Sequence, residues 1–379
     1  MHTNQQKHIH VNRHLQRNDG YPPLTGLRPE RFDRPDILKR LNAASRRLAE
    51  LKGVAASMPN QDILISTLGL QEAKDSSAIE NIVTTHDELF REGNSPDDAS
   101  PVATKEVARY RQALHVGYRR VRETGLLTNN DLIAIQETLE QNRAGFRKLP
   151  GTALKDGAGR TVYTPPQDPR DIANLMTDLE SFVNDGARYD ADPLIKMALI
   201  HHQFESIHPF YDGNGRTGRI LNVLYLVKED LLDIPVLYMS RHIVRTKPDY
   251  YRLLQEVRDH DRWEDWVLYL LTAVEKTAAA GITTVQAIKD LLLDTKHRLR
   301  DQHGKLYSQD LINSLFSHPY TKIEYIERDL RVSRITAMKY LNTLVESGFL
   351  QKQKFGRTNY YINQPLYDIL AGESMQGES

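Results

Sequence analysis

Apolar residues recur at helical spacing along most of the chain. Leucines between residues 38 and 51 follow this rule, and a further helix is expected to start near Asp62. The stretch LIKMALIHHQF is apolar nearly all round, and Asp192-Pro193 precedes it as an N-cap and a first-turn proline. The pattern predicts a buried helix there. The clearest amphipathic face consists of Ile172, Leu175, Met176, Leu179, Phe182 and Val183.

Two segments are predicted to contain β-strands. Gly151–Pro166 contains turn residues followed by the β-prone Thr161-Val162-Tyr163, which predicts a short β-hairpin. Between residues 323 and 344, two short apolar helical faces are separated by a turn, and Ser333 is expected to cap the second helix. Residues 348–362 then predict strand, turn and strand. The fold class expected is mainly α, with a helical core, a β-hairpin and a C-terminal winged helix-turn-helix unit.

The same patterns divide the chain into six parts. They are a flexible tail (1–20), an N-terminal helical region (21–100), a helical core (101–285), a connector helix (286–304), a winged helix (305–370) and a second tail (371–379).

Composition and charge exclude several classes of protein and of active site. The chain has 379 residues, 40% of them hydrophobic, with 50 Lys+Arg against 50 Asp+Glu, so any basic surface must be local. It has no cysteine, which excludes disulfides, thiolate metal sites and a Cys nucleophile and fits a reducing compartment. The N-terminus has no apolar stretch, so we expect no signal peptide, no membrane contact and a cytoplasmic location.

The segment from His208 to Arg219 (HPFYDGNGRTGR) carries the chemistry. Pro209 disfavours a helical conformation at His208, so the buried helix should end there. Gly213-Asn214-Gly215 permits a tight turn whose amides converge at the start of the next helix, and Arg216 and Arg219 follow; together they predict a phosphate site. Asp212 is a candidate Mg²⁺ ligand, and His208 has the ordinary pKa of a general base.

The segment allows three other interpretations. Gly213, Gly215 and Gly218 match the dinucleotide fingerprint, but that motif follows a β-strand and here a buried helix precedes it. His201, Glu205 and His208 have metal-ligand spacing, although we favour His201 and His202 as hydrogen-bonded core residues. The third interpretation, a plain helix–helix turn, conflicts with the number of phosphate-binding groups in so short a segment.

The twelve residues match the HxFx(D/E)GNGRxxR signature, so the chain resembles Fic-domain proteins over roughly residues 21–275. The resemblance implies a protein adenylyltransferase that transfers AMP from ATP to a Ser, Thr or Tyr hydroxyl of a target protein or itself. His208 would act as the base and Asp212 would hold Mg²⁺. The phosphates would bind to Gly213, Asn214, Gly215, Arg216, Thr217, Gly218 and Arg219, with Arg219 on the γ-phosphate.

The resemblance also assigns two flanking elements. The hairpin residues Thr161, Val162, Tyr163 and Thr164 would form a flap that aligns the target by strand addition; the alternative is a plain surface hairpin. Tyr250 and Tyr251 fall where the family places aromatic residues near the nucleoside, and core aromatic residues are the alternative.

Upstream of the loop, Ser76, Glu80 and Asn81 match the family's inhibitory pattern (S/T)xxxE(G/N). The resemblance implies that Glu80 pairs with Arg219 and blocks the γ-phosphate position, because a carboxylate can replace phosphate as a partner of arginine. Some family members use this glutamate to remove AMP, so de-AMPylation stays open.

The C-terminal unit has a local net charge. Between Arg331 and Arg357 the net charge is +5, because the basic residues Arg331, Arg334, Lys339, Lys352, Lys354 and Arg357 stand against Glu346 alone. DNA binding and a protein or homodimer interface are both open. The alternative to an enzyme is a DNA-binding regulator whose Fic core senses nucleotide, and UTP or CDP-choline are alternative donors.

Overall fold

The computed structural model describes residues 24–92 and 101–372. The predicted tail 1–20, the segment 93–100 and all but two residues of the predicted tail 371–379 lie outside the described residues. The described chain is mainly helical with two small antiparallel sheets, which confirms the expected fold class. No helix in these ranges is both long and apolar enough to cross a bilayer.

The elements follow in chain order. They are α1 (Pro35–Ala56), α2 (Asp62–Ile79), α3 (His86–Glu92), α4 (Val102–Thr124), α5 (Asn129–Glu140), β1 (Leu154–Lys155), β2 (Thr161–Tyr163), α6 (Pro169–Asn184), α7 (Pro193–Ile207), α8 (Asn214–Lys228), α9 (Ser240–Arg245), α10 (Lys247–His260), α11 (Trp263–His303), α12 (Gln309–Ser317), β3 (Tyr320–Thr321), α13 (Ile323–Leu330), α14 (Arg334–Glu346), β4 (Gln351–Phe355), β5 (Thr358–Ile362) and α15 (Gln364–Ala371). Short 3₁₀ turns cover Leu24–Gly26, Pro29–Phe32 and Gly186–Arg188.

The core is built around α7 and α8. Every residue of α7 after Pro193 is buried, as its apolar sequence predicts, and Asp192 caps it by accepting a hydrogen bond from the Leu194 amide at 2.8 Å. Helix α8 is buried from Arg216 to Val227. The two helices pack against each other, with α4, α5, α6 and α11 around them, so the loop that joins them is held at both ends by the core.

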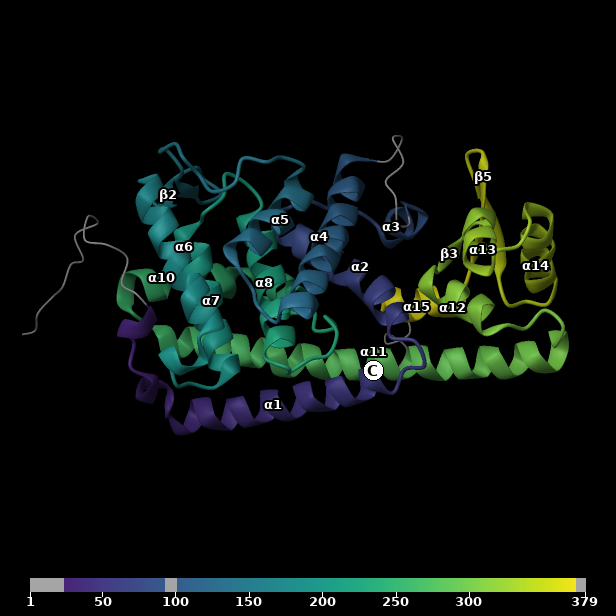
Figure 1. Ribbon diagram of the computed structural model, residues 1–379, viewed down its shortest axis with the longest axis horizontal. Coiled ribbons are helices and arrows are strands. Elements are labelled where there is room, and N and C mark those ends of the chain that lie inside the picture. Colours follow the sequence, from purple (N-terminus) through teal and green to yellow (C-terminus); the bar gives the residue numbers. More distant parts are fainter. Residues whose placement is uncertain (1–23, 93–100, 373–379) are drawn as a thin grey trace, which may run out of the picture.

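A single helix of 41 residues, α11, runs along the molecule beside α1 and reaches the C-terminal unit (Figure 1). The predicted connector 286–304 is therefore not a separate helix: residues 286–303 continue α11 without a break. The reason is local, because residues 263–303 contain no proline and a single glycine. That glycine, Gly281, faces α1, where an added Cβ would lie 3.2 Å from Leu51 Cδ1.

The two sheets match the predicted hairpins. Strands β1 and β2 pair antiparallel, and β4 and β5 form a second hairpin that β3 extends in the order β3-β5-β4. Ser333 caps α14 by accepting a hydrogen bond from the Thr336 amide at 3.3 Å, as predicted. Helices α13 and α14 and the β4–β5 hairpin follow one another in the order predicted for the C-terminal unit, and its assignment as a winged helix stays a prediction.

The C-terminal unit packs against the helices that follow the Glu80 segment. Tyr320 on β3 donates a hydrogen bond to Asp87 on α3 at 2.7 Å, and its ring stacks on Phe90. The Arg91 guanidinium lies 4.5 Å from the ring centre of Phe355 on β4. Helix α12 also packs on α2.

Candidate active site

The loop between α7 and α8 begins and ends with left-handed residues. His208 ends α7 with φ 49° and ψ 58°, because Pro209 excludes the helical conformation one residue earlier. Gly213, with φ 78°, is the residue before α8, a conformation that glycine adopts without strain. The chain reverses within the residues between them, so His208 lies beside the N-terminus of α8.

The side chain of Asn214 braces this loop. Its Oδ1 accepts a hydrogen bond from the Phe210 amide and its Nδ2 donates to the Phe210 carbonyl, both at 2.8 Å. Phe210 is fully buried against Phe146 and Phe204. These two hydrogen bonds hold the Asn214 side chain on the loop and leave its second Nδ2 hydrogen unused, so its contact with phosphate stays a prediction.

His208 carries a neutral imidazole at physiological pH. Burial lowers its pKa to about 4, and the charges of Arg147 and Arg258 act in the same direction. A backbone hydrogen bond with Glu205 and the charge of Glu80 act in the opposite direction but do not outweigh burial. A neutral imidazole is the form that can accept a proton.

Arg219 is held by α2. It is 4% exposed, and its Nε donates to Ser76 Oγ at 2.8 Å while Nη2 donates to the Ser76 carbonyl at 3.0 Å. Nη2 also donates to Glu80 Oε1 at 2.9 Å. Burial would raise the pKa of Glu80, but the charge and hydrogen bond of Arg219 outweigh it and hold that pKa below its ordinary value. The predicted Glu80–Arg219 contact is therefore present.

The Glu80 carboxylate also lies against the first turn of α8. A Cβ on Gly215 would stand 2.3 Å from Glu80 Oε1, so only glycine admits the carboxylate there. Negative charge is favoured at a helix N-terminus, where amides lack partners within the helix. Asn81 follows with φ 63°, and its Oδ1 accepts a hydrogen bond from Lys247 at 3.1 Å.

Arg216 pairs with carboxylates other than Glu80. Its guanidinium is buried and donates to Glu140 at 2.8 Å and to Glu106 at 3.4 Å. A Cβ on Gly213 would meet Glu140 Oε1 at 2.5 Å. Arg216 is thus neutralised by two carboxylates from α4 and α5, and a contact with phosphate requires it to leave them.

Thr217 and Gly218 belong to the core. Thr217 is fully buried, and a Cβ on Gly218 would lie 2.6 Å from Glu205 Oε1 and 3.0 Å from Phe204. Gly218 lets α7 and α8 approach closely. Burial raises the pKa of Glu205 to about 7. The phosphate contacts of Thr217 and Gly218 stay predictions.

Asp212 is exposed on the loop, and its Oδ1 accepts a hydrogen bond from the Gly213 amide at 2.7 Å. One accessible carboxylate next to an anion site suits Mg²⁺, which takes one or two carboxylates together with phosphate oxygens and water. Within the described ranges no group of three or more His, Asp or Glu side chains could hold a metal by itself. The triad of His201, Glu205 and His208 is therefore not a metal site.

The two tyrosines differ. Tyr250 is 2% exposed, donates or accepts a hydrogen bond with His201 Nε2 at 2.9 Å, and packs on Trp266, so it is a core aromatic residue. Tyr251 is 45% exposed, and the charges of Glu80 and Arg219 influence its pKa, which burial raises. Only Tyr251 is available to a nucleoside. His202 bonds to the Leu254 carbonyl at 3.2 Å, so both histidines are core residues, as favoured.

The hairpin lies next to His208. Thr161, Val162 and Thr164 are exposed, and Thr164 follows the end of β2. Tyr163 turns inward: its hydroxyl donates to the Ser206 carbonyl at 2.9 Å, and Arg258 lies 4.0 Å from its ring centre. The hairpin is therefore attached to the C-terminus of α7, which positions His208.

Three family models match the chain and together cover more than half of it. They are "Fic/DOC family N-terminal" over residues 38–119, "Fic/DOC family" over 126–226, and "Protein adenylyltransferase SoFic-like, C-terminal domain" over 291–366. The chain belongs to the Fic/DOC family. The 126–226 match contains the whole loop from His208 to Arg219.

Curated relatives of this Fic protein are named protein adenylyltransferases. The protein from Aedes aegypti is 28% identical over 155 residues, or 40% of this chain and 30% of that protein. The protein from Caenorhabditis elegans is 30% identical over 177 residues, or 45% of this chain and 33% of that protein. The chain thus spans about a third of the length of these relatives.

Solved structures share the fold. A Fic family protein from Desulfovibrio desulfuricans G20 superposes with a TM-score of 0.54 at 22% identity, covering 87% of this chain and 96% of that chain. Fic-1 from C. elegans superposes with a TM-score of 0.51 at 18% identity, covering 65% of this chain and 71% of that chain. The first match extends over most of this Fic protein.

Among the basic residues of the C-terminal unit, Arg334 is already paired with carboxylates. Arg334 donates to Glu324 at 2.8 Å and to Glu327 at 3.3 Å, so α13 neutralises it. Ile335 and Met338 on α14 are 76% and 43% exposed. Since the exposed helix carries apolar as well as basic side chains, DNA, protein and homodimer contacts at this unit stay predictions.

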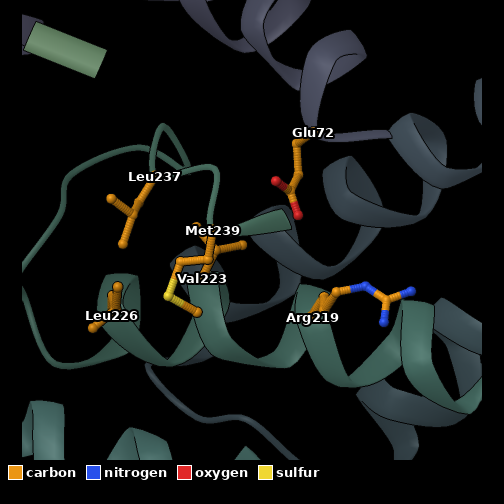
Figure 2. Close-up of a pocket in the computed structure, with 6 residues that line it drawn as sticks. All are labelled: Glu72, Arg219, Val223, Leu226, Leu237 and Met239. Atoms are coloured by element: carbon orange, nitrogen blue, oxygen red, sulfur yellow. The ribbon is translucent and has the colours of Figure 1, made fainter. Parts of the chain in front are cut away.

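Sequence reasoning missed the polar residues behind the Fic loop. Glu72, on α2, is buried and accepts hydrogen bonds from Ser240 and Tyr110, and burial raises its pKa to about 8. Glu72 and Ser76 lie four residues apart on α2 and Glu80 follows four residues later at its end, and this spacing could have indicated Glu72. It faces a narrow cavity, shown in Figure 2, that is lined by Glu72, Arg219, Val223, Leu226, Leu237 and Met239.

Proposed function

We propose that this Fic protein transfers AMP from ATP to a hydroxyl side chain of a target protein or of itself and releases pyrophosphate. The observation that carries the proposal is the juxtaposition of a neutral His208 with an anion site made by the N-terminus of α8 and Arg219. Phosphoryl-type transfer needs little beyond a positioned base and stabilised charge, and the segment from His208 to Arg219 offers groups for both. The names of the curated relatives support the same activity.

The reaction forms a bond between the target oxygen and the α-phosphorus and breaks the bond from that phosphorus to the bridging oxygen of pyrophosphate. The proton of the hydroxyl goes to His208. The amides at the start of α8 and Arg219 bind the phosphates, and Tyr251 lies beside the nucleoside. Asp212 would hold Mg²⁺, which would supply positive charge to neutralise the phosphates.

The phosphate-binding set is smaller than the signature suggests. Asn214 acts by bracing the loop, and Gly218 by packing. Arg216 contributes only if ATP draws it away from Glu140. We assign the main charge contact to Arg219.

Glu80 inhibits the protein in this proposal. Its carboxylate bonds to Arg219 and lies at the first turn of α8, so it occupies the position that the γ-phosphate needs. The exposed edge of the hairpin at Thr161 and Val162 receives an extended target segment, and Tyr163 anchors it. Removal of AMP through Glu80 is the reverse activity that the family resemblance leaves open.

The test is labelling with nucleotides in a Glu80→Gly background. We expect incorporation from α-labelled ATP into the protein itself or into a lysate protein, and its loss in Glu80→Gly/His208→Ala. Parallel reactions with labelled UTP and CDP-choline identify the donor. Equal labelling in the double variant excludes His208 as the base, and no labelling from any donor contradicts the transferase activity.

A further inference from the structure

The last backbone carbonyls of α7 accept hydrogen bonds from side chains. A helix leaves its last carbonyls without amide partners. Here the Glu205 carbonyl accepts from Arg258 at 3.4 Å, and the Ser206 carbonyl accepts from Tyr163 at 2.9 Å. Arg147 serves the next two: its Nη2 donates to the Ile207 carbonyl at 3.3 Å and its Nε donates to the His208 carbonyl at 2.7 Å.

Arg147 also holds the segments on either side. Its main-chain amide donates to the Pro209 carbonyl at 2.8 Å, so it binds the peptide groups before, at and after His208. Its Nη2 donates to the Pro166 carbonyl at 2.9 Å, on the chain that leaves the hairpin. One side chain therefore connects the loop with the base of the flap.

Arg147 is 1% exposed and forms no ion pair with a carboxylate among the described residues. Burying an unpaired cation is costly, and here the compensation is backbone carbonyls at the negative end of a helix. Lysine cannot reproduce this, because only the guanidinium has several donors in a fixed plane.

We propose that Arg147 is a positioning residue for AMP transfer, which fixes the His208 peptide relative to the flap so that the base meets the target hydroxyl. This inference rests on the proposed function. Arg147 touches neither the N-terminus of α8 nor Arg219 in the described hydrogen bonds, so its loss should affect the chemical step more than ATP binding.

The experiment compares Arg147→Met and Arg147→Lys in the Glu80→Gly background. We expect kcat to fall about 100-fold in Arg147→Met, the size of effect that a displacement of about 1 Å produces, while KM for ATP changes less than about twofold. Arg147→Lys should recover only part of kcat. Arg143→Met, at an exposed arginine four residues earlier, is the matched control and should behave as the parent.

A second readout does not depend on activity. The groups whose charges act on His208 are Arg147 and Arg258, which lower its pKa, and Glu80, which raises it. Titration of the His208 imidazole by NMR in the otherwise wild-type protein should give a higher pKa in Arg147→Met and an unchanged one in Arg147→Lys, which keeps the charge.

The outcomes separate the two proposals. No transfer by the Glu80→Gly parent overturns the proposed function, while the NMR titration still tests the placement of Arg147. If Arg147→Met loses kcat and ATP affinity only in proportion to its loss of folded protein, and the pKa of His208 does not change, Arg147 has only a structural role and this inference is overturned. An unchanged kcat in a folded Arg147→Met protein overturns it as well.

Discussion

Replacing Glu80 with glycine should activate the protein, because Glu80 competes with the γ-phosphate for Arg219. ATP can bind productively only after the 2.9 Å contact between Arg219 Nη2 and Glu80 Oε1 is broken. The Ser76 contacts of Arg219 do not involve Glu80, so the guanidinium keeps its position in the variant.

The size of the gain follows from this contact. A hydrogen bond between charged groups contributes about 1.5–3 kcal/mol. The Glu80 side chain is 35% exposed, so solvent reduces the value to the lower part of that range, about 1.5–2 kcal/mol. At about 1.4 kcal/mol per factor of ten, we expect kcat/KM for ATP to rise about 10- to 30-fold.

The assay is the initial rate of incorporation from α-labelled ATP at subsaturating concentration. Glu80→Gln should give a smaller gain, since the amide still fills the space beside Gly215 but loses the charge. Glu123→Gly, at an exposed glutamate in the last turn of α4, is the control and should change nothing. A gain below about twofold in a folded Glu80→Gly protein would refute the competition between carboxylate and phosphate.

Three further predictions follow from the site. The pKa of His208 is lowered to about 4, so the imidazole stays neutral as the pH falls. The transfer rate of the Glu80→Gly protein should therefore decline only near pH 4. A decline of that rate near pH 6.5 would contradict the burial argument. Chelation of divalent cations and the substitution Asp212→Asn should each abolish most of the transfer activity. Added Mg²⁺ should restore activity after chelation but not in Asp212→Asn. Full activity in excess EDTA would exclude the metal role of Asp212. Gly218→Ala forces a methyl group to within 2.6 Å of Glu205 and should destabilise the fold by about 1–3 kcal/mol, visible as a lower Tm, whereas Gly26→Ala, in open space, should not.

The sequence predicted the elements that local chemistry determines. Pro209 ends α7, Asp192 and Ser333 cap their helices, and the hairpin at Thr161–Tyr163 follows from turn and β-prone residues. The length of α11 was missed because residues 286–304 were interpreted as a separate connector helix. No helix-stopping residue marks the start of that segment.

The motif located the site, but it did not distinguish residues that can bind phosphate from residues that pack in the core. The position of each residue around α8 separates them: Gly215 and Arg219, four residues apart, share the face toward Glu80, while Gly218 faces α7. The same criterion separates buried Tyr250 from exposed Tyr251. Arg147 was not predicted, because its role depends on contacts with residues about 60 positions away.

The central claim is that this Fic protein transfers the nucleotidyl group of ATP with His208 as the base. The most direct measurement compares Glu80→Gly protein incubated with ATP labelled at the α- or the γ-phosphate, followed by mass spectrometry of the labelled band. We predict label from the α-position only, a mass increase of one AMP on a hydroxyl side chain, and neither in Glu80→Gly/His208→Ala. Label from the γ-position, or α-label that persists without His208, would contradict the account.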